Sequence, residues 1–283
     1  MKYRIVSDSS CDILTLPGVD FVSVPLHIVT AEKDYADDAA LDVPGMVAEL
    51  RRYKGKTTTS CPNAQQWEDA FGDADAVFAL TITSRLSGSY NAACCARDQY
   101  EQAYPGRHVF VIDSLSTGPE LVLLLRHLRE LVQEGLSFAE IAVRIKAYQQ
   151  RTHLLFVLSS VQNLARNGRA SKLEAEAVGL LGIRVLGRAL DGRLDVVGKF
   201  RGEDAAVIKT VLQMNRMGWK GGKTVLTHCG NEAGAKKLRR ALLEICPAAE
   251  IDILPTGGLC SFYAEAGGLL IGFEGADKEM TDA

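Results

Sequence analysis

The strongest constraint on the fold of this chain is that short β-branched segments alternate with amphipathic helical segments through its first half. Four apolar segments have the length and composition of buried strands: Tyr3–Ser7, Phe21–Val24, Val77–Ile82 and His108–Ile112. Helical patterns lie between and after them, and three begin at the capping residues Asp42, Asn63 and Ser137. Because parallel strands need helical crossovers, residues 1–152 are predicted to form an N-terminal domain with a mostly parallel sheet flanked by helices.

The rest of the chain, residues 153–283, is predicted to form a C-terminal mixed α/β domain. Its expected strands are Leu154–Leu158, Asp195–Phe200, Thr224–His228, Ile251–Leu254 and Leu269–Phe273. Asp204 is expected to cap a helix, and a second helix is expected to end before Pro247. No element is assigned to the apolar stretch that Gly179 and Gly187 interrupt. Because no long linker separates the two domains, we expect them to abut and to hold a ligand between them.

Composition and charge narrow the class of protein. The net charge of −3 on 283 residues gives no electrostatic reason to expect binding to nucleic acid, and at most transient contact with a membrane. The seven cysteines include no Cys-x-x-Cys pair, which argues against a disulfide framework or zinc site and favours the reducing cytoplasm. The longest aliphatic run, Leu121–Leu125, is far shorter than the roughly 20 apolar residues that cross a bilayer.

Motifs of the common enzyme classes are absent or incomplete. Gly222-Lys223-Thr224 matches the end of a P-loop, but Met217 stands where the first glycine is required. The sequence contains no nucleophile elbow, zinc-protease helix or dinucleotide fingerprint. A serine-dependent lipid or thioester hydrolase remains an alternative, because catalytic triads assemble across a fold. Its candidate residues are Ser87 or Ser114 as the nucleophile and His228 as the base.

Four segments rich in small hydroxyl residues follow predicted strands or precede predicted helices. They are Ser7–Ser10, Thr57–Pro62, Thr83–Asn91 and Asp113–Gly118. In an open parallel sheet, ligands bind beyond the carboxyl ends of the strands, where helix N-termini offer free N–H groups and partial positive charge. Hydroxyl groups there can also donate hydrogen bonds, so the segments together predict binding of a carboxylate or a phosphate. Each segment taken alone also fits simple helix capping.

Several motifs, taken in order, resemble those of the DegV family. Thr59-Ser60-Cys61-Pro62 is similar to the family's Thr-Ser-Gln-Pro element, and Leu86–Ala93 to its Leu-Ser-Gly-Thr-Tyr-Gln-Ser-Ala element. Asp8-Ser9-Ser10 resembles the opening Asp-Ser-Thr. Further segments that match in order are Ser160–Ala170, Leu190–Gly192, Lys199–Arg201 and Thr227–Gly230. The resemblance covers nearly the whole chain.

The resemblance implies two α/β domains with a long-chain fatty acid in a tunnel between them, whose carboxylate is presented to a separate fatty acid kinase. By position, it implies that the fatty acid contacts Thr59, Ser60, Ser87, Gly88, Asn91 and Tyr263. It also implies phosphate or partner contacts for Arg166, Arg169 and Arg201. Apolar residues of the tunnel are expected in Leu154–Val161 and Leu180–Leu190.

A carrier of this kind needs no catalytic residue of its own, no metal and no cofactor besides its bound fatty acid. Burying an acyl chain in a protein gains about 0.8 kcal/mol for each methylene group, which is enough to hold a long chain. A regulatory protein that senses a small carboxylate would leave the same pattern of hydroxyl residues. The sequence therefore favours a lipid carrier over a hydrolase, with the sensor as a further alternative.

Two positions depart from the family pattern. Where the family has His-x-Gly-Pro-Gly, this chain has Tyr263-Ala264-Glu265-Ala266-Gly267, so a neutral phenol replaces the histidine and an acid is added. The family's Ile-Lys-Pro-Ile-Leu run is Ile183-Arg184-Val185-Leu186 here, without the proline. The first departure bears on how the chain handles a phosphate, and the second on local backbone shape.

Overall fold

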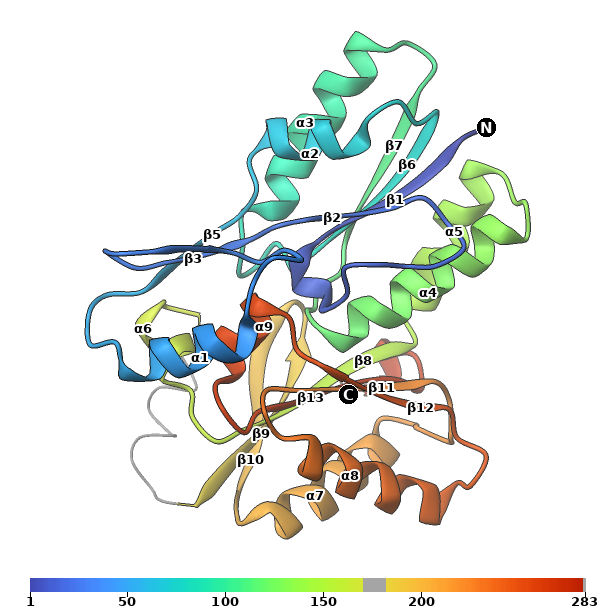
Figure 1. Cartoon of the computed structure of the whole chain (residues 1–283). Coiled ribbons are helices and arrows are strands. Elements are labelled where there is room, and N and C mark those ends of the chain that lie inside the picture. The colour runs from blue at the N-terminus through green and yellow to red at the C-terminus, as the bar shows by residue number, and fades with distance from the viewer. Residues whose placement is uncertain (170–181, 282–283) are drawn as a thin grey trace.

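The computed structural model describes residues 1–169 and 182–281, and its N-terminal part is built on a four-stranded sheet. The strands, in the spatial order β2-β1-β6-β7, are Phe21–Val24, Tyr3–Asp8, Ala76–Thr81 and His108–Asp113. All three strand pairs are parallel, as the alternation predicts. Two helices cover each face (Figure 1), namely α2 (Ala64–Phe71) and α3 (Ser89–Ala103), and α4 (Pro119–Gln133) and α5 (Phe138–Gln149).

The two faces of this sheet are buried in separate apolar cores, which explains why its strands read as continuous apolar runs. In β1, Ile5 packs with the core under α4 and α5, whereas Val6 packs with the core under α2 and α3. In β6, Phe78 likewise packs with the core under α4 and α5, and Val77 with the core under α2 and α3. Alternate side chains of a strand point to opposite faces, so each strand supplies both cores.

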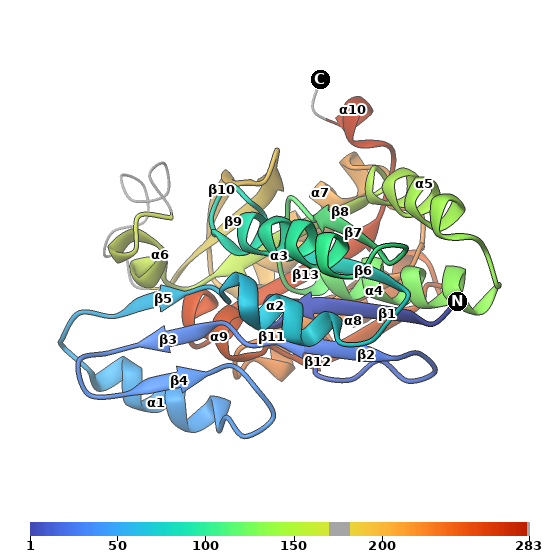
Figure 2. The same ribbon diagram turned by 90° about the horizontal axis from the view of Figure 1, so that it is seen from above.

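A smaller antiparallel sheet extends to one side of the first sheet (Figure 2). Its strands, in the order β4-β3-β5, are Asp34–Ala36, His27–Val29 and Thr58–Ser60. A short 3-10 helix, η1 (Ser9–Cys11), follows β1, and α1 (Val43–Arg52) packs beside the small sheet through Met46. Strands of three residues are too short to give an alternating pattern, and the sequence did not predict them.

The C-terminal part contains a six-stranded mixed sheet in the order β10-β9-β8-β13-β11-β12. Its strands are Arg193–Arg201, Ile183–Leu190, Thr152–Leu158, Leu269–Glu274, Thr224–His228 and Ile251–Pro255. Only the β11–β12 pair of this sheet is parallel. The predicted division between residues 152 and 153 falls at the start of β8, and it stays a prediction.

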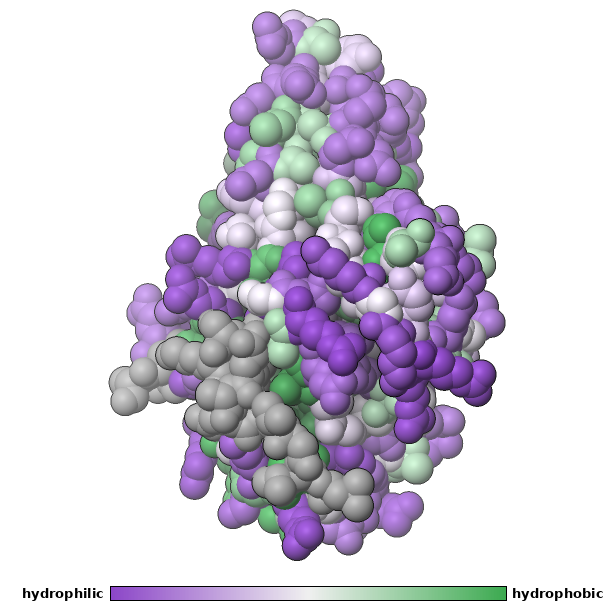
Figure 3. All heavy atoms as spheres, turned by 90° about the vertical axis from the view of Figure 1, so that its left-hand side faces the viewer, coloured by the Kyte–Doolittle hydropathy of each residue, from purple (hydrophilic) through white to green (hydrophobic). Residues whose placement is uncertain are grey.

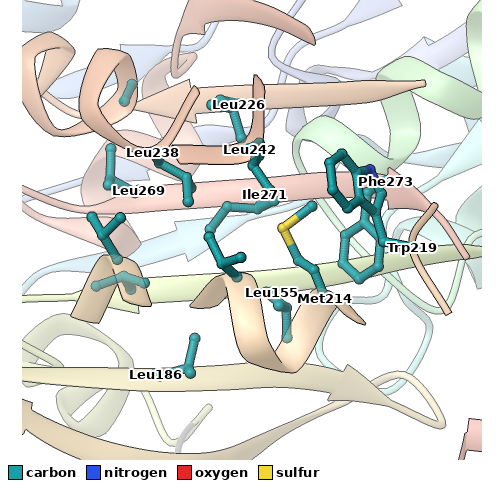
Figure 4. Packing of buried hydrophobic residues seen from close by; sticks show 14 of the residues in the cluster. Leu155, Leu186, Met214, Trp219, Leu226, Leu238, Leu242, Leu269, Ile271 and Phe273 are labelled. Carbon is teal, nitrogen blue, oxygen red and sulfur yellow. The ribbon is translucent and has the colours of Figure 1, made fainter. Parts of the chain in front are cut away.

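Helices α7 (Glu203–Arg216) and α8 (Glu232–Ile245) cover the outer face of this sheet. Met214 of α7 and Leu238 of α8 lie in one apolar cluster with Leu155, Ile271 and Phe273 of the strands (Figure 4). The opposite face meets α4, whose first half, Pro119–Leu125, is buried on all sides because it lies between the two large sheets. The run Leu121–Leu125, with every side chain at most 1% exposed, is therefore the centre of the molecule.

Helix starts were predicted well from capping residues, with one exception. The side chains of Asp42, Asn63 and Ser137 each accept a backbone N–H hydrogen bond three residues on, as expected. Asp204 was predicted to cap α7, and this was wrong. The helix begins at Glu203, after Gly202, so Asp204 lies within the first turn. Its negative charge there interacts favourably with the partial positive charge of the helix N-terminus.

Three short helices complete the fold: α6 (Gln162–Arg166), α9 (Gly258–Ala264) and α10 (Lys278–Thr281). Helix α9 packs on η1, β3, α1 and α6, so a C-terminal segment lies against the N-terminal part. Within residues 1–169 and 182–281, no helix is both long and apolar enough to span a bilayer. The same residues contain no cluster of three histidine, cysteine or acidic side chains that could hold a metal ion.

Candidate functional site

A cavity of about 290 Å³ lies where the carboxyl ends of the parallel strands, the inner face of the mixed sheet and α9 meet. Its apolar walls are formed by Leu26, Ile82, Leu86, Leu154, Phe156, Leu158, Leu164, Leu194, Leu259, Ala264 and Leu270. An engineered apolar cavity about half as large, ~150 Å³, stays dry and takes up benzene. The cavity is therefore suited to an apolar ligand.

Strand β8 supplies the apolar wall through alternate residues. Leu154, Phe156 and Leu158 line the cavity, whereas Leu155 and Val157 pack in the core on the other face. Of the second predicted wall segment, residues 180 and 181 lie outside the described residues, and no residue of 182–190 lines the cavity. The neighbouring strand β10 contributes Leu194 instead.

Polar groups gather in one part of the lining. The structure brings together five of the six residues predicted to contact a fatty acid, together with one of the three arginines; they are Thr59, Ser60, Ser87, Gly88, Tyr263 and Arg169. The hydroxyl oxygens of Thr59 and Tyr263 are 2.7 Å apart and share a hydrogen bond. Burial raises the pKa of Tyr263, so its phenol stays protonated and able to donate near neutral pH.

The N-terminus of α3 opens into this polar part of the cavity. Gly88 is the N-cap residue and provides no side-chain cap, while Ser87 accepts a hydrogen bond from the N–H of Ser89 at 3.3 Å. A helix of 15 residues carries a partial positive charge at this end, and its first N–H groups lack partners within the helix. The lining therefore combines an apolar wall with donors that suit a carboxylate.

The remaining predicted residues lie elsewhere. Asn91 is exposed in the first turn of α3 and does not line the cavity. Arg166 is exposed in a separate polar pocket that also includes Arg51 and Lys54 of the α1 end. Arg201 is exposed at the end of β10 and lines neither pocket. Of the three arginines, Arg169 alone reaches the cavity, with its guanidinium 6.0 Å from the centre of the Tyr263 ring.

Asp8, at the end of β1, does not line the cavity but holds the segments that form its polar part. Its buried carboxylate accepts hydrogen bonds from the Ser10 and Ser89 hydroxyls at 2.5 and 2.6 Å and from the N–H of Ile82 at 2.9 Å. These bonds join β1, the end of β6 and the first turn of α3. The Ser7–Ser10 segment thus supports the site from within the fold and does not line the cavity.

Two further acids, the buried Asp37 and the half-buried Asp12, hold α9 in place. The carboxylate of Asp37 accepts hydrogen bonds from the N–H groups of Gly258 at 2.6 Å and Leu259 at 2.9 Å. Asp12 accepts one from the N–H of Gly257 at 2.8 Å, and burial raises the pKa of Asp12 to about 7. Sequence reasoning missed both acids, because a loop aspartate more than 200 residues from its partners gives no local signal.

The geometry does not favour the hydrolase alternative. Among the described residues, His228 makes no side-chain hydrogen bond to a serine, and its Nδ1 is buried without a partner. Ser114 is fully buried and donates its hydroxyl to the carbonyl of Ser116. Burial lowers the pKa of His228, so the imidazole is neutral, but a base must also reach its nucleophile.

Nearly the whole chain is similar in sequence to one known protein family. A family model described as "uncharacterised protein, DegV family" matches residues 2–274, which is nearly the whole chain. The chain belongs to the DegV family. A DegV domain-containing protein of Streptococcus pneumoniae is 43% identical over 279 residues, which cover 97% of this chain and 99% of that protein. One from Streptococcus pyogenes serotype M1 is 39% identical over the same length.

Solved structures of DegV proteins share the fold closely. One from Eubacterium eligens, loaded with heptadecanoic acid, has a TM-score of 0.94 and 41% identity, and covers 97% of this chain and 100% of its own. The Fatty Acid Kinase (Fak) B3 protein of Streptococcus pneumoniae, loaded with linoleic acid, has a TM-score of 0.95 and 42% identity, over 98% and 100% of the two chains. The resemblance that the sequence motifs indicate is confirmed.

The structure explains one departure from the DegV pattern. Glu265 stands at the first glycine of His-x-Gly-Pro-Gly and has a φ of 54°, a backbone conformation that favours glycine. Its carboxylate accepts a hydrogen bond from the N–H of Asn163 at 3.0 Å, at the start of α6. The added acid therefore supports α6 and lines the polar pocket together with Arg166, whereas Tyr263 lines the apolar cavity.

The molecular surface on the side of α1 and α6 is mainly hydrophilic. In Figure 3, hydrophobic residues are visible in a narrow gap between strongly hydrophilic side chains on this face. A mainly hydrophilic surface over an apolar interior is the arrangement that the hydrophobic effect favours in water.

Proposed function

We propose that this DegV protein binds a long-chain fatty acid in the cavity and presents its carboxylate to a separate fatty acid kinase. The observation that carries the proposal is the single cavity wall of leucines and Phe156 that ends at the N-terminus of α3 and the Thr59–Tyr263 pair. The relatives loaded with heptadecanoic acid and linoleic acid support it. The name of the second relative supports the kinase as the partner.

In this proposal the protein shields the acyl chain of a poorly soluble fatty acid from water, and it catalyses no reaction itself. Transfer of the acyl chain from water is favourable by about 0.8 kcal/mol for each methylene group buried. Hydrogen bonds from Thr59, Ser87 and the first N–H groups of α3 would hold the carboxylate, and Arg169 would meet the phosphate that the kinase adds. The proposed location is the cytoplasm, as the cysteine pattern predicts.

Ser87→Ala is expected to weaken binding of oleate by roughly 10-fold to 100-fold, because a hydrogen bond to a charged group contributes about 1.5–3 kcal/mol. The matched control is Ser116→Ala. Ser116 is buried nearby, its hydroxyl has no partner among the described residues, and it does not line the cavity. Titration of delipidated protein with oleate measures both variants. Equal affinities for the two would show that Ser87 does not contact the carboxylate.

A further inference from the structure

Phe156 of β8 lies with its ring over Gly187 of β9. The two residues are direct partners in the antiparallel β8–β9 pair, so positions 156 and 187 share one face of the sheet. A Cβ atom at position 187 would lie 2.2 Å from Cζ and 2.4 Å from Cε2 of Phe156. The ring therefore occupies the space in which any other residue at 187 would place its side chain.

This placement bears directly on the cavity, because Phe156 is one of its lining residues. Leu154 and Leu158 flank it on the same face of β8, so Phe156 lies in the middle of the part of the apolar wall that β8 forms. The edge of the ring that carries Cζ and Cε2 lies over Gly187. A side chain at 187 would push the ring off β9, and the open side is the cavity.

We propose that the Phe156–Gly187 pair sets the length and bulk of the acyl chain that the cavity accepts. The inference rests on the proposed function, since it concerns the ligand of the same cavity. Because Gly187 has no side chain, the Phe156 ring can lie against β9 and leave the cavity deeper. The ring itself then forms the boundary of the cavity at this point. No contact with the carboxylate is involved, so the pair acts on the choice of acyl chain and leaves recognition of the head group unchanged.

The test compares binding of laurate, palmitate, stearate and oleate to delipidated protein. In Gly187→Ala the ring tips into the cavity, and each methylene group that loses its burial weakens binding by about fourfold. Affinity for stearate and oleate is therefore expected to fall on the order of tenfold or more, with little change for laurate. Phe156→Leu is expected to shift preference the other way, toward the longer and bent chains.

Gly187→Ala also strains the backbone, because the new Cβ would lie 2.7 Å from the carbonyl oxygen of Asp195 on β10. Gly198→Ala is the control for a methyl group added elsewhere on the same hairpin, where the nearest atoms belong to a side chain. Its Cβ would lie 2.7 Å from Cζ of Phe200 on the same hairpin, but Phe200 packs with the core on the opposite face of the sheet. Gly198→Ala should lower the melting temperature and leave the order of acyl affinities unchanged.

The double variant Gly187→Ala with Phe156→Leu completes the test. Removing the ring is expected to restore stearate binding in the presence of the alanine, even if the hairpin remains strained. The inference would be overturned if Gly187→Ala and Phe156→Leu both left the relative affinities for the four acids unchanged. It would also be overturned if Gly187→Ala weakened laurate and stearate binding equally and the added Phe156→Leu change did not restore either. Wild-type protein that binds none of the four acids would instead contradict the proposed function.

Discussion

Asp37→Ala is expected to lower the free energy of unfolding by about 3 kcal/mol, because it leaves two buried N–H groups without acceptors at the start of α9. Asp37 is 4% exposed, and its carboxylate bonds to the N–H groups of Gly258 and Leu259. Chemical denaturation followed by circular dichroism measures the change. Fatty acid binding should weaken as well, because α9 carries Leu259 and Tyr263 of the cavity lining.

Asp38→Ala is the control for this prediction. Asp38 is the exposed neighbour of Asp37 and accepts a single hydrogen bond from the N–H of Ala40, so its loss should cost only about 0.5 kcal/mol. Asp37→Asn should fall between the two, because its amide oxygen can still accept from α9. Similar stabilities of the Asp37→Ala and Asp38→Ala variants would show that Asp37 does not hold α9.

Arg169→Ala is expected to lower the rate of phosphorylation of the bound fatty acid by roughly 10-fold to 100-fold, because a bond to a charged group contributes about 1.5–3 kcal/mol. Its guanidinium lies at the cavity, where it donates to the carbonyl of Asn167 at 2.7 Å and faces the Tyr263 ring. Oleate affinity should change much less, since the α3 N-terminus and hydroxyl groups suffice for the carboxylate.

A reconstituted assay with a fatty acid kinase, run beside an oleate titration, tests this prediction. Arg52→Ala is the control, because Arg52 is exposed on α1 and lines neither pocket. Arg166→Ala and Arg201→Ala, which lie away from the cavity, should raise KM for the loaded carrier through weaker partner contact and leave kcat unchanged. An Arg169→Ala protein that is phosphorylated at the wild-type rate would remove this arginine from the transfer step.

The parts of the fold with local signals were predictable from sequence. Phe21–Val24 and Thr224–His228 match their strands residue for residue, because each is a short β-branched run between segments that favour turns. The β9 strand was missed because Gly187 and two arginines interrupt its pattern, although the glycine is needed to seat Phe156. Helix α9 was also missed, since only seven residues that are buried almost throughout show no amphipathic period.

The candidate site was predictable only where chain order reflects position in space. Ser87 could be placed at the site because it follows β6, and the carboxyl ends of parallel strands meet at one edge. Thr59 lies in β5 of the small antiparallel sheet, and the helix start that follows it was the local signal. Tyr263 comes from a distant helix, and the family resemblance, not the pattern of residues, pointed to it. Asp8, Asp12 and Asp37 stabilise the site by long-range hydrogen bonds, and a buried acid cannot be told from an exposed one by its neighbours in sequence.

Native mass spectrometry of the purified recombinant protein tests the central claim most directly. The account predicts a complex whose added mass is that of one long-chain fatty acid from the expression host, and a melting temperature that falls on delipidation and recovers with oleate or palmitate. A protein that carries no stoichiometric lipid, and that neither oleate nor palmitate stabilises, would contradict the assignment of the cavity to a fatty acid.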